Sequence, residues 1–342
     1  MKTAIVPSIV GVGSTDAGLL SDDILTAGRS QEQPYTVTWD DLTYLTGPNV
    51  HLYARPSERL DFRRLSEGPE LVALTYTTLG VLLGSGEHTL SLMIGLPVEV
   101  MADRAQALAI LRAWQTWLVG EHAFKINTRR VRLIVEGVQI TSQPAGAYAA
   151  WAFNDRGQVV LSKDDQRATV AVCDIGFNTL DLLTMRAGQP VLNLTGGDTA
   201  GMRRAAETLR QTLARAYRVN LTRHEADALL RMARPEVETR LGFQDVRAEV
   251  TQALGVAASG VVSFVNERWA DAGNISRVLF TGGGAEALRD ELLKAYPHGR
   301  VLPHAVTANA LGLARMARRA FADAPVVVGL DPGFGGFKAV LL

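Results

Sequence analysis

Apolar and polar positions along the chain follow strand-like and helix-like periods in turn. Residues 4–10 form an apolar, β-branched run that predicts a strand, and residues 37–50 have the pattern of a hairpin. Helical periodicity follows at 70–83 and at 104–119, on either side of a predicted strand at 89–94. This alternation of strand, turn and helix is typical of an α/β fold.

The rest of the chain continues the alternation. The further predicted strands are 130–140, 168–173, 180–185, 191–194, 278–280 and 326–330. The further predicted helices are 147–153, 200–217, 224–232, 243–270, 285–295 and 308–321. Polar residues 13–33 indicate an exposed excursion, and the polar, glycine-containing stretch 154–165 favours a domain boundary.

Length and charge narrow the class of protein. A chain of 342 residues exceeds the usual size of one hydrophobic core, which indicates two domains or one large α/β domain. With 47% hydrophobic residues the chain is globular and not disordered. Thirty-five basic residues balance 35 acidic ones, so there is no basic excess for direct nucleic-acid binding.

The composition also bears on location. The single Cys173 excludes an intramolecular disulfide, and no zinc-ligand spacing is present. The least polar long stretch that we identify, residues 71–83, is shorter than the roughly 20 residues of a membrane helix, so we expect no membrane partner. Pro7 and Gly11 interrupt the N-terminal apolar run, which argues against a signal peptide. We therefore expect a cytoplasmic protein.

The predicted strand 326–330 runs into a glycine-rich turn between Asp331 and Lys338. The turn contains Gly333, Phe334, Gly335 and Gly336. Glycines allow backbone N–H groups to approach a phosphate closely. Only four residues follow Lys338, too few for the helix of a P-loop or dinucleotide fold. We therefore predict a phosphate-binding hairpin, with Asp331 near a metal and Lys338 within reach of the β- or γ-phosphate.

The D-x-G-F core of this turn occurs a second time, beginning at Asp174. The repeat continues through Gly176, Phe177, Asn178 and Thr179. Two such hairpins facing each other could grip a polyphosphate and hold a hydrated magnesium ion between their aspartates. A tight structural hairpin is the alternative interpretation of either one alone.

A third glycine cluster connects the predicted strand 278–280 to a helix. It consists of Gly282, Gly283 and Gly284. A nucleoside could lie on this bare backbone, or the glycines could simply form the first turn of the helix.

Together these motifs resemble those of the actin-like ATPases, the superfamily that includes heat-shock chaperone ATPases and sugar kinases. The matching segments are Asp331–Lys338 and Asp174–Thr179 (the two phosphate loops), Thr281–Ala285 (the adenosine loop), and Gln143–Gly146 and Thr307–Gly312 (the interdomain connections). Residues 94–98, 143–148 and 308–312 look most like plasmid-segregation actins of the ParM and StbA type and their archaeal relatives.

The resemblance implies an actin-like α/β fold of two domains with ribonuclease H-like sheets and a nucleotide cleft between them. Domain I would contain residues 1–153 and 303–342, and domain II residues 160–302. The implied function is a filament-forming ATPase that uses ATP or GTP with Mg²⁺ in plasmid or DNA segregation or another cytoskeletal role. Its partners would be further copies of itself and a DNA-binding adaptor. The alternatives are a monomeric ATPase or small-molecule kinase of the superfamily, and a nucleotide-binding scaffold that does not hydrolyse.

Specific roles follow from the resemblance. Asp174 and Asp331 would hold magnesium through bound waters. Gln143 would orient the attacking water, with Gln139 and Glu136 as alternatives. The segment Gly196, Gly197 and Asp198 would approach the nucleotide, and Glu225 would hold the ribose hydroxyls.

The order of the motifs departs from the family, because the first phosphate loop closes the chain instead of opening it. This order looks like a circular permutation. We therefore expect the terminal strands 326–330 and 337–341 to lie in one sheet with residues 4–9.

Overall fold

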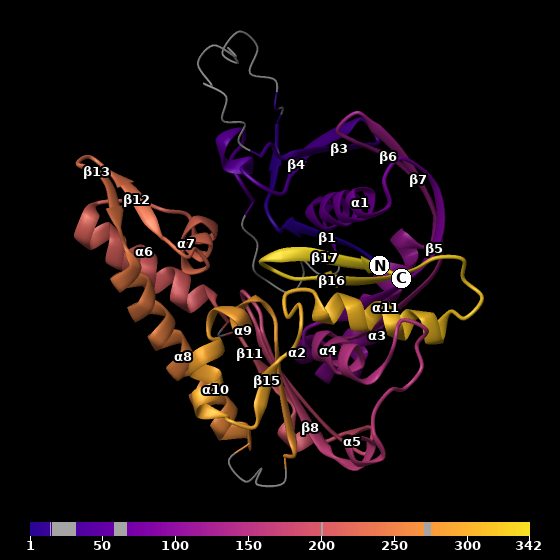
Figure 1. Cartoon of the computed structure of the whole chain (residues 1–342). Helices are drawn as coiled ribbons and strands as arrows, with labels where there is room; N and C mark the ends of the chain where they lie inside the picture. Colours follow the sequence, from indigo (N-terminus) through magenta and orange to yellow (C-terminus); the bar gives the residue numbers. More distant parts are fainter. Residues whose placement is uncertain (14, 16–31, 58–66, 200, 270–274) are drawn as a thin grey trace.

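The computed structural model describes residues 1–13, 15, 32–57, 67–199, 201–269 and 275–342. Two mixed sheets with helices packed against them make up most of the molecule, and a small two-stranded hairpin projects from one side (Figure 1). Three predictions fall partly outside the described residues. They concern most of the excursion at 13–33, residue 200 at the start of the helix predicted at 200–217, and residue 270 at the end of the helix predicted at 243–270.

The larger sheet has nine strands in the order β1-β17-β16-β5-β7-β6-β3-β4-β2. Its strands are β1 (Lys2–Pro7), β2 (Val10–Val12), β3 (Tyr35–Trp39), β4 (Leu42–Thr46), β5 (Gly86–Leu96), β6 (Gly120–Ile126), β7 (Arg129–Ser142), β16 (Val327–Pro332) and β17 (Gly336–Leu341). Strand β17 lies between β1 and β16 and is antiparallel to both, with Lys2 opposite Leu341. The two chain ends are therefore neighbours, and the predicted pairing of the terminal segments is confirmed (Figure 1).

The smaller sheet has the order β10-β9-β8-β14-β15, with β11 added to β9. Its strands are β8 (Thr169–Ile175), β9 (Leu180–Arg186), β10 (Gln189–Pro190), β11 (Gly196–Asp198), β14 (Arg277–Thr281) and β15 (Gly299–Val301). Strand β8 pairs antiparallel with β9 and parallel with β14. Strand β16 has the same two kinds of neighbour, β17 and β5, so the two D-x-G-F hairpins occupy equivalent places in the two sheets.

The helices follow the predicted pattern in most places. They are α1 (Pro69–Leu83), α2 (Val98–Ala102), α3 (Arg104–Leu118), α4 (Gln143–Ala152), α5 (Lys163–Arg167), α6 (Arg203–Tyr217), α7 (Arg223–Leu230), α8 (Arg247–Trp269), α9 (Gly283–Ala287), α10 (Arg289–Ala295) and α11 (Ala308–Ala320), with 3-10 turns η2 (Val50–Leu52) and η4 (Leu192–Leu194). The helix predicted at 285–295 is two helices, α9 and α10, which meet at Leu288.

Three sequence predictions are wrong. The strand predicted at 191–194 is the 3-10 turn η4. The Thr184 and Trp269 side chains donate hydrogen bonds to the Leu194 carbonyl, which is therefore not available to pair with a neighbouring strand. The segment 196–198, from which we expected the helix predicted at 200–217 to open, is strand β11, and α6 starts at Arg203. The helix predicted from 243 starts at 247, because residues 242–245 form β13 (Gly242–Asp245) opposite β12 (Glu236–Thr239).

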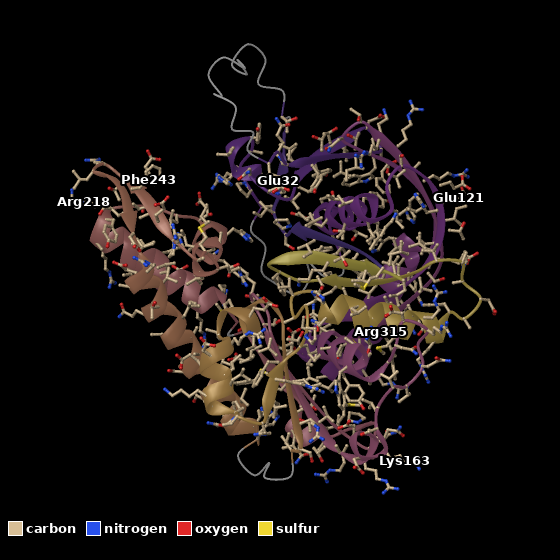
Figure 2. All side chains as sticks on the ribbon, viewed as in Figure 1. Glu32, Glu121, Lys163, Arg218, Phe243 and Arg315 are labelled. Carbon is tan, nitrogen blue, oxygen red and sulfur yellow. The ribbon has the colours of Figure 1, made fainter. Side chains whose placement is uncertain are left out.

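Strand β6 was not predicted. Exposed and less exposed residues alternate along the whole strand, but Gly120 and His122 are among the less exposed ones, so the sequence lacks the apolar alternation typical of a strand. The pairing of β6 with both β7 and β3 decides its conformation. Phe243 lies on the projecting hairpin β12–β13, and it is 67% exposed (Figure 2).

Helix α8 is a longer apolar segment than residues 71–83, which we identified from the sequence as the least polar long stretch. It is long and apolar enough to cross a membrane by length and composition alone, a test that residues 71–83 do not meet because they are shorter. A single such helix is weak evidence for a membrane span, since core helices of soluble proteins pass the same test. Here Val250, Val261 and Val265 on one face of α8 are buried in the hydrophobic core.

The two connecting helices α4 and α11 cross at a pair of glycines. A Cβ atom on Gly312 would overlap the Gly146 carbonyl oxygen, and one on Gly146 would overlap the backbone of Asn309. The helices can approach this closely only because both positions lack side chains. Arg315 on α11 strengthens the same junction by donating to the Ala150 carbonyl and to Asp155 (Figure 2).

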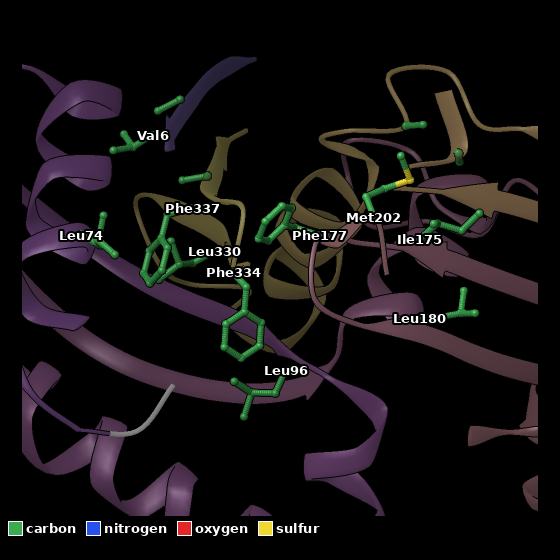
Figure 3. Close-up of a cluster of buried hydrophobic side chains, with 14 of the residues drawn as sticks. Val6, Leu74, Leu96, Ile175, Phe177, Leu180, Met202, Leu330, Phe334 and Phe337 are labelled. Atoms are coloured by element: carbon green, nitrogen blue, oxygen red, sulfur yellow. The ribbon is translucent and has the colours of Figure 1, made fainter. Parts of the chain in front are cut away.

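The core continues up to both D-x-G-F turns. Phe337 and Leu330 pack with Leu74 of α1, which lies against the nine-stranded sheet (Figure 3). Phe334 in the first turn lies beside Leu96, and Phe177 in the second faces the first turn (Figure 3). The apolar residues of the two turns therefore anchor them, while their polar residues remain available to a ligand.

Candidate functional site

The two D-x-G-F hairpins meet at their tips. A Cβ atom on Gly335 would lie only 2.8 Å from the Cβ atom of Phe177, so the first turn touches the second. Between them is a cavity of about 210 Å³. Its lining includes Gln143, Asp174, Gly176, Phe177, Asn178, Thr179, Gly282, Gly283, Asp331, Gly333, Phe334, Gly335, Gly336 and Lys338. The structure thus brings together most of the residues that the sequence assigned to one site.

Asp331 is the buried anion of the first hairpin. It is 1% exposed and lies opposite Lys338 in the β16–β17 register. The Lys338 Nζ is 3.1 Å from Oδ2, and Gln143 Nε2 donates to Oδ1 at 2.7 Å. Gln143, at the start of α4, thereby connects this helix to the first hairpin.

Asp174 is the buried anion of the second hairpin. Asn309, in the first turn of α11, donates from Nδ2 to its Oδ2 at 2.7 Å. Burial first, and then the negative charge of Asp331, raise the pKa of Asp174 to about 6, against the opposing effects of Asn309 and Lys338. The two carboxyl groups therefore repel each other across one cavity.

This arrangement fits a magnesium ion. Two buried carboxylates line one cavity, and the Asn309 Oδ1 atom is buried with no hydrogen-bond partner among the described residues. Oxygen atoms of this kind are the donors that Mg²⁺ prefers, directly or through its waters. Asp174 and Asp331 would hold the ion, and a cation between them would relieve their repulsion. Among the described residues no group of three or more His, Cys, Asp or Glu forms a closed metal site.

The glycine cluster borders the same cavity from β14. Gly282 has a positive φ of 85°, and a side chain there would collide with Asp174 Oδ1 and the Ile175 carbonyl. Only glycine can hold this turn so close to the second hairpin. Gly284 instead faces Ile175 and Met202 and is not part of the cavity lining.

Besides Gly284, four predicted residues lie outside this cavity. Gly196, Gly197 and Asp198 form β11, where they pair with β9, and Asp198 lies 3.8 Å from Arg204. Glu225 closes a capping box with Thr222 at the start of α7, and its other oxygen lies 3.8 Å from His51. Glu225 lines an adjoining cavity of about 310 Å³ and not the one between the hairpins.

The two alternatives to Gln143 lie elsewhere. Glu136 and Gln139 line a separate depression beside Phe321, on the outer part of β7. A larger depression of about 500 Å³, bounded by Trp39 and Phe124, lies over strands β3, β5, β6 and β7 of the nine-stranded sheet and contains none of the predicted site residues. Of the three candidates, only Gln143 borders the cavity between the hairpins.

Sequence reasoning missed three polar residues of the site. Asn309 lay within a recognised motif, but nothing in the motif showed that its amide would reach Asp174. Asp227 and Arg231, near the end of α7, also line the cavity. A helical i, i+4 acid–base pair is common on any surface, so no signal in the sequence distinguished this one.

A further buried acid joins the two sheets. The Val98 N–H, at the start of α2, donates to Asp181 Oδ1 on β9 at 2.6 Å. Burial first, and then the neighbouring Asp174 charge, raise the pKa of Asp181 to about 7, against the opposing hydrogen bonds from Val98 and Thr179. The segment that follows β5 is thus attached directly to the second hairpin.

Two family models match the chain. The family model for the N-terminal domain of actin-like proteins matches residues 1–146, and the model for the C-terminal part of the archaeal actin homologue MreB-like family matches residues 172–294. No curated protein sequence matches the chain.

Similar solved structures include Ta0583, an archaeal actin homologue, at 15% identity over 94% of this chain and 100% of that one, with a TM-score of 0.69. The pCBH ParM non-polymerisable quadruple mutant is 18% identical over 92% of both chains, with a TM-score of 0.70. The actin-like protein Alp7A is 17% identical over 93% of this chain and 91% of its own, with a TM-score of 0.66.

The two family models together match well over half of the chain, and the structural neighbours cover nearly all of it. The predicted actin-like α/β fold is confirmed. With two sheets that present equivalent hairpins to one cavity, and with both family models describing actin-like proteins, this chain belongs to the actin-like proteins.

Proposed function

We propose that this protein binds a nucleoside triphosphate with Mg²⁺ between its two D-x-G-F hairpins, hydrolyses it, and assembles into filaments whose subunit contacts depend on the nucleotide. The observation that carries the proposal is the meeting of the two hairpins at one cavity, with a buried carboxylate on each side. The archaeal actin homologue Ta0583, of similar fold, has been solved in complex with ADP.

The residues divide the work by their chemistry. Lys338 would attract the β- or γ-phosphate, and the glycine turns would let backbone N–H groups approach it. Gln143 would orient the attacking water, since phosphoryl transfer depends on positioning more than on a strong base. Asp174 and Asp331 would hold the magnesium ion, which when bound neutralises charge that develops on the phosphate oxygens.

The proposal that the protein assembles into filaments rests on a solved structure of similar fold. One structure of similar fold, at 16% identity and a TM-score of 0.68, is a 15-stranded ParM filament from Clostridium botulinum. We infer that the partner is a second copy of this chain, in a head-to-tail contact that does not close on itself. Plasmid or DNA segregation through a DNA-binding adaptor, in the cytoplasm, is the setting that we propose.

Sedimentation and phosphate release, measured in parallel, test the proposal. With ATP or GTP and Mg²⁺ we expect pelletable polymer and released phosphate, and with EDTA neither. The Asp331→Ala variant should do neither under any condition, because it loses the carboxylate that orients Lys338 and Gln143. A phosphorylated small molecule in place of polymer would support a kinase, and nucleotide binding without either product would support a scaffold.

We also propose that residues 1–153 with 303–342 and residues 160–302 act as the two domains, and that the motif order is a circular permutation. The adjacency of β1 and β17 supports the second point. Joining the two ends by a short linker and opening the chain between Arg318 and Pro325 should give a protein that folds and assembles like the original. Loop closure would change stability by only about 1 kcal/mol. A rearranged chain that fails to fold would overturn the permutation.

A further inference from the structure

Strand β3 covers only part of the edge of β6 in the nine-stranded sheet. The two strands pair antiparallel at two positions, the last of them Thr38 opposite Lys125, and β3 ends at Trp39. The next residues, Asp40 and Asp41, have positive φ angles of 48° and 60° and turn the chain back into β4. The first half of β6 therefore has β7 on one side and no strand of the described residues on the other.

The backbone groups left open by this turn belong to Glu121 and Ala123. Successive residues of an antiparallel strand direct their N–H and C=O groups alternately to one neighbouring strand and to the other. The Asn127 N–H, just after β6, donates to the Thr36 carbonyl, so odd-numbered residues of this segment direct their backbone groups to the β3 side. At Glu121 and Ala123 β3 has already turned away, and their N–H and C=O groups can pair with a further strand.

The depression of about 500 Å³ lies at this gap. Its lining includes adjacent residues of β3, Thr38 and Trp39, and adjacent residues of β6, Ala123 and Phe124. The Phe124 ring stacks on Tyr76 with the ring centroids 4.4 Å apart, so the wall is aromatic at this point. A free strand edge beside apolar walls suits an extended peptide, because main-chain hydrogen bonds give affinity and the walls receive side chains.

The charged side chains around the depression indicate the chemistry of the peptide. Lys125 and Arg130 lie opposite each other in the β6–β7 register, where like charges destabilise a strand pair. Neither has an ion pair among the residues that the structure describes, whereas their neighbour Arg132 is bound by Glu87 and Glu121, each at 2.7 Å. The two acids of the β3–β4 turn line the depression from β3, so an acidic side chain of the peptide belongs on the β6–β7 side.

We propose that the free edge of β6 binds an extended peptide of a partner protein, which adds a strand beside Glu121 and Ala123 and directs an acidic side chain toward Lys125 and Arg130. A peptide residue opposite Ala123 points to the same face of the sheet as Lys125, its diagonal neighbour, which a long side chain reaches. An acid there relieves the repulsion between the two bases. The inference does not depend on nucleotide binding, because the depression and the cavity between the hairpins share no lining residue and β3 and β6 lie far from the smaller sheet (Figure 1).

Amide hydrogen exchange of the wild-type protein, measured residue by residue by NMR, tests whether the edge is open. In the free protein the Glu121 and Ala123 amides should exchange at least about tenfold faster than those of His122 and Phe124, which face β7. Protection of all four in dilute protein would overturn the inference, because the edge would already be covered. Protection of Glu121 and Ala123 that grows with protein concentration would also overturn it, because a second copy of this chain would then occupy the edge.

A phage-displayed library of linear peptides, selected on the wild-type protein, supplies the probe. Fluorescence anisotropy then measures the strongest selected peptide against wild type and variants. Ala123→Pro should weaken binding by at least about tenfold, since proline removes the N–H that faces the open edge, where an edge strand tolerates it. Ala123→Val keeps that N–H and should bind as wild type does. Lys125→Met should weaken binding by about threefold, and Lys163→Met, on the distant helix α5, is the matched control that should not.

The same peptide should slow amide exchange at Glu121 and Ala123 when it binds the wild-type protein, a result that does not require any variant to fold. A bound peptide that leaves these two amides exchanging as before would overturn the added strand. So would a peptide that binds Ala123→Pro as tightly as wild type, or a library from which no peptide is enriched on wild type over Ala123→Pro. Equal binding by Lys125→Met and wild type would overturn the acidic chemistry that we assign to the peptide.

Discussion

The two D-x-G-F hairpins share a sequence core and a place in their sheets, but their aspartates face different partners across the strand pair. Asp331 lies opposite Lys338, whereas Asp174 lies opposite Asp181. Opposite charges in such a pair stabilise a sheet, and like charges destabilise it. The first hairpin therefore carries its own counter-charge, and the second lacks one within its strands.

This difference separates the tasks of the two carboxylates. Lys338 and Gln143 hold Asp331 from two sides. Asp174 accepts from the neutral Asn309, and burial together with the Asp331 charge raises its pKa to about 6. We infer that Asp331 is a permanent anchor, while the charge of Asp174 becomes favourable only when a cation enters the cavity.

The largest effect should come from removing the carboxylate that lacks a counter-charge. Asp174→Ala should reduce hydrolysis by about 1,000-fold or more, because one side of the metal site is lost. Nucleotide binding should become weak or independent of Mg²⁺. Single-turnover phosphate release and titration with and without EDTA measure the two effects, and near-normal turnover would remove the second hairpin from the active site.

Gln143→Ala tests whether the side chain that holds Asp331 also orients the attacking water. Hydrolysis should slow by about 100-fold with little change in nucleotide affinity, because the amide would act in the transition state. Filaments should then persist longer, as seen by light scattering after ATP addition. Gln139→Ala is the matched control, since that residue lies outside the cavity. Loss of affinity with normal turnover per bound nucleotide would make Gln143 structural only.

The pH dependence of stability tests the raised pKa of Asp174. A folded-state pKa of about 6, above the ordinary 3.8, means that folding favours the protonated form. This contribution is present below pH 4 and is lost as the pH rises through 6. Without nucleotide or Mg²⁺, Asp174→Asn should therefore be more stable than wild type at pH 7.5, by on the order of 2 kcal/mol, and about equal to it at pH 4.

Thermal unfolding across pH measures this difference directly. Asp331→Asn offers a second check, because removal of its charge should lower the pKa of Asp174 and weaken the pH dependence. A constant difference between wild type and Asp174→Asn from pH 4 to 7.5 would show that Asp174 titrates normally.

The smallest effect should come from removing Lys338, the counter-charge of Asp331. Lys338→Met should weaken nucleotide binding by roughly tenfold, through loss of one charged hydrogen bond to phosphate. It should also raise the pKa of Asp174 further, because the Lys338 charge lowers it. Lys163→Met, on the distant helix α5, is the control for charge alone. Unchanged affinity in Lys338→Met would make this lysine a purely structural partner of Asp331.

Local patterns predicted most of the elements, and the failures occurred where tertiary contacts decide. Helix α1 and the β16–β17 hairpin were predicted within one or two residues, since periodicity and turn glycines determine them locally. The turn η4 and hairpin β12–β13 were missed, because side-chain hydrogen bonds and strand pairing decide their conformations. The apolar character of helix α8 was not recognised from the sequence, because which of its residues are buried depends on tertiary packing.

For the site, the sequence by itself determined the two D-x-G-F turns, the glycine cluster at 282–284 and the acid and lysine of the first hairpin, because these are short-range patterns of residue type. Only the tertiary structure decided which of them meet. It excluded Glu225 and the segment 196–198 from the cavity between the hairpins, and it added Asn309 and Arg231. Such contacts join residues separated by more than 50 positions, as with Arg231 and Gly283, and no local preference encodes the geometry that brings them together.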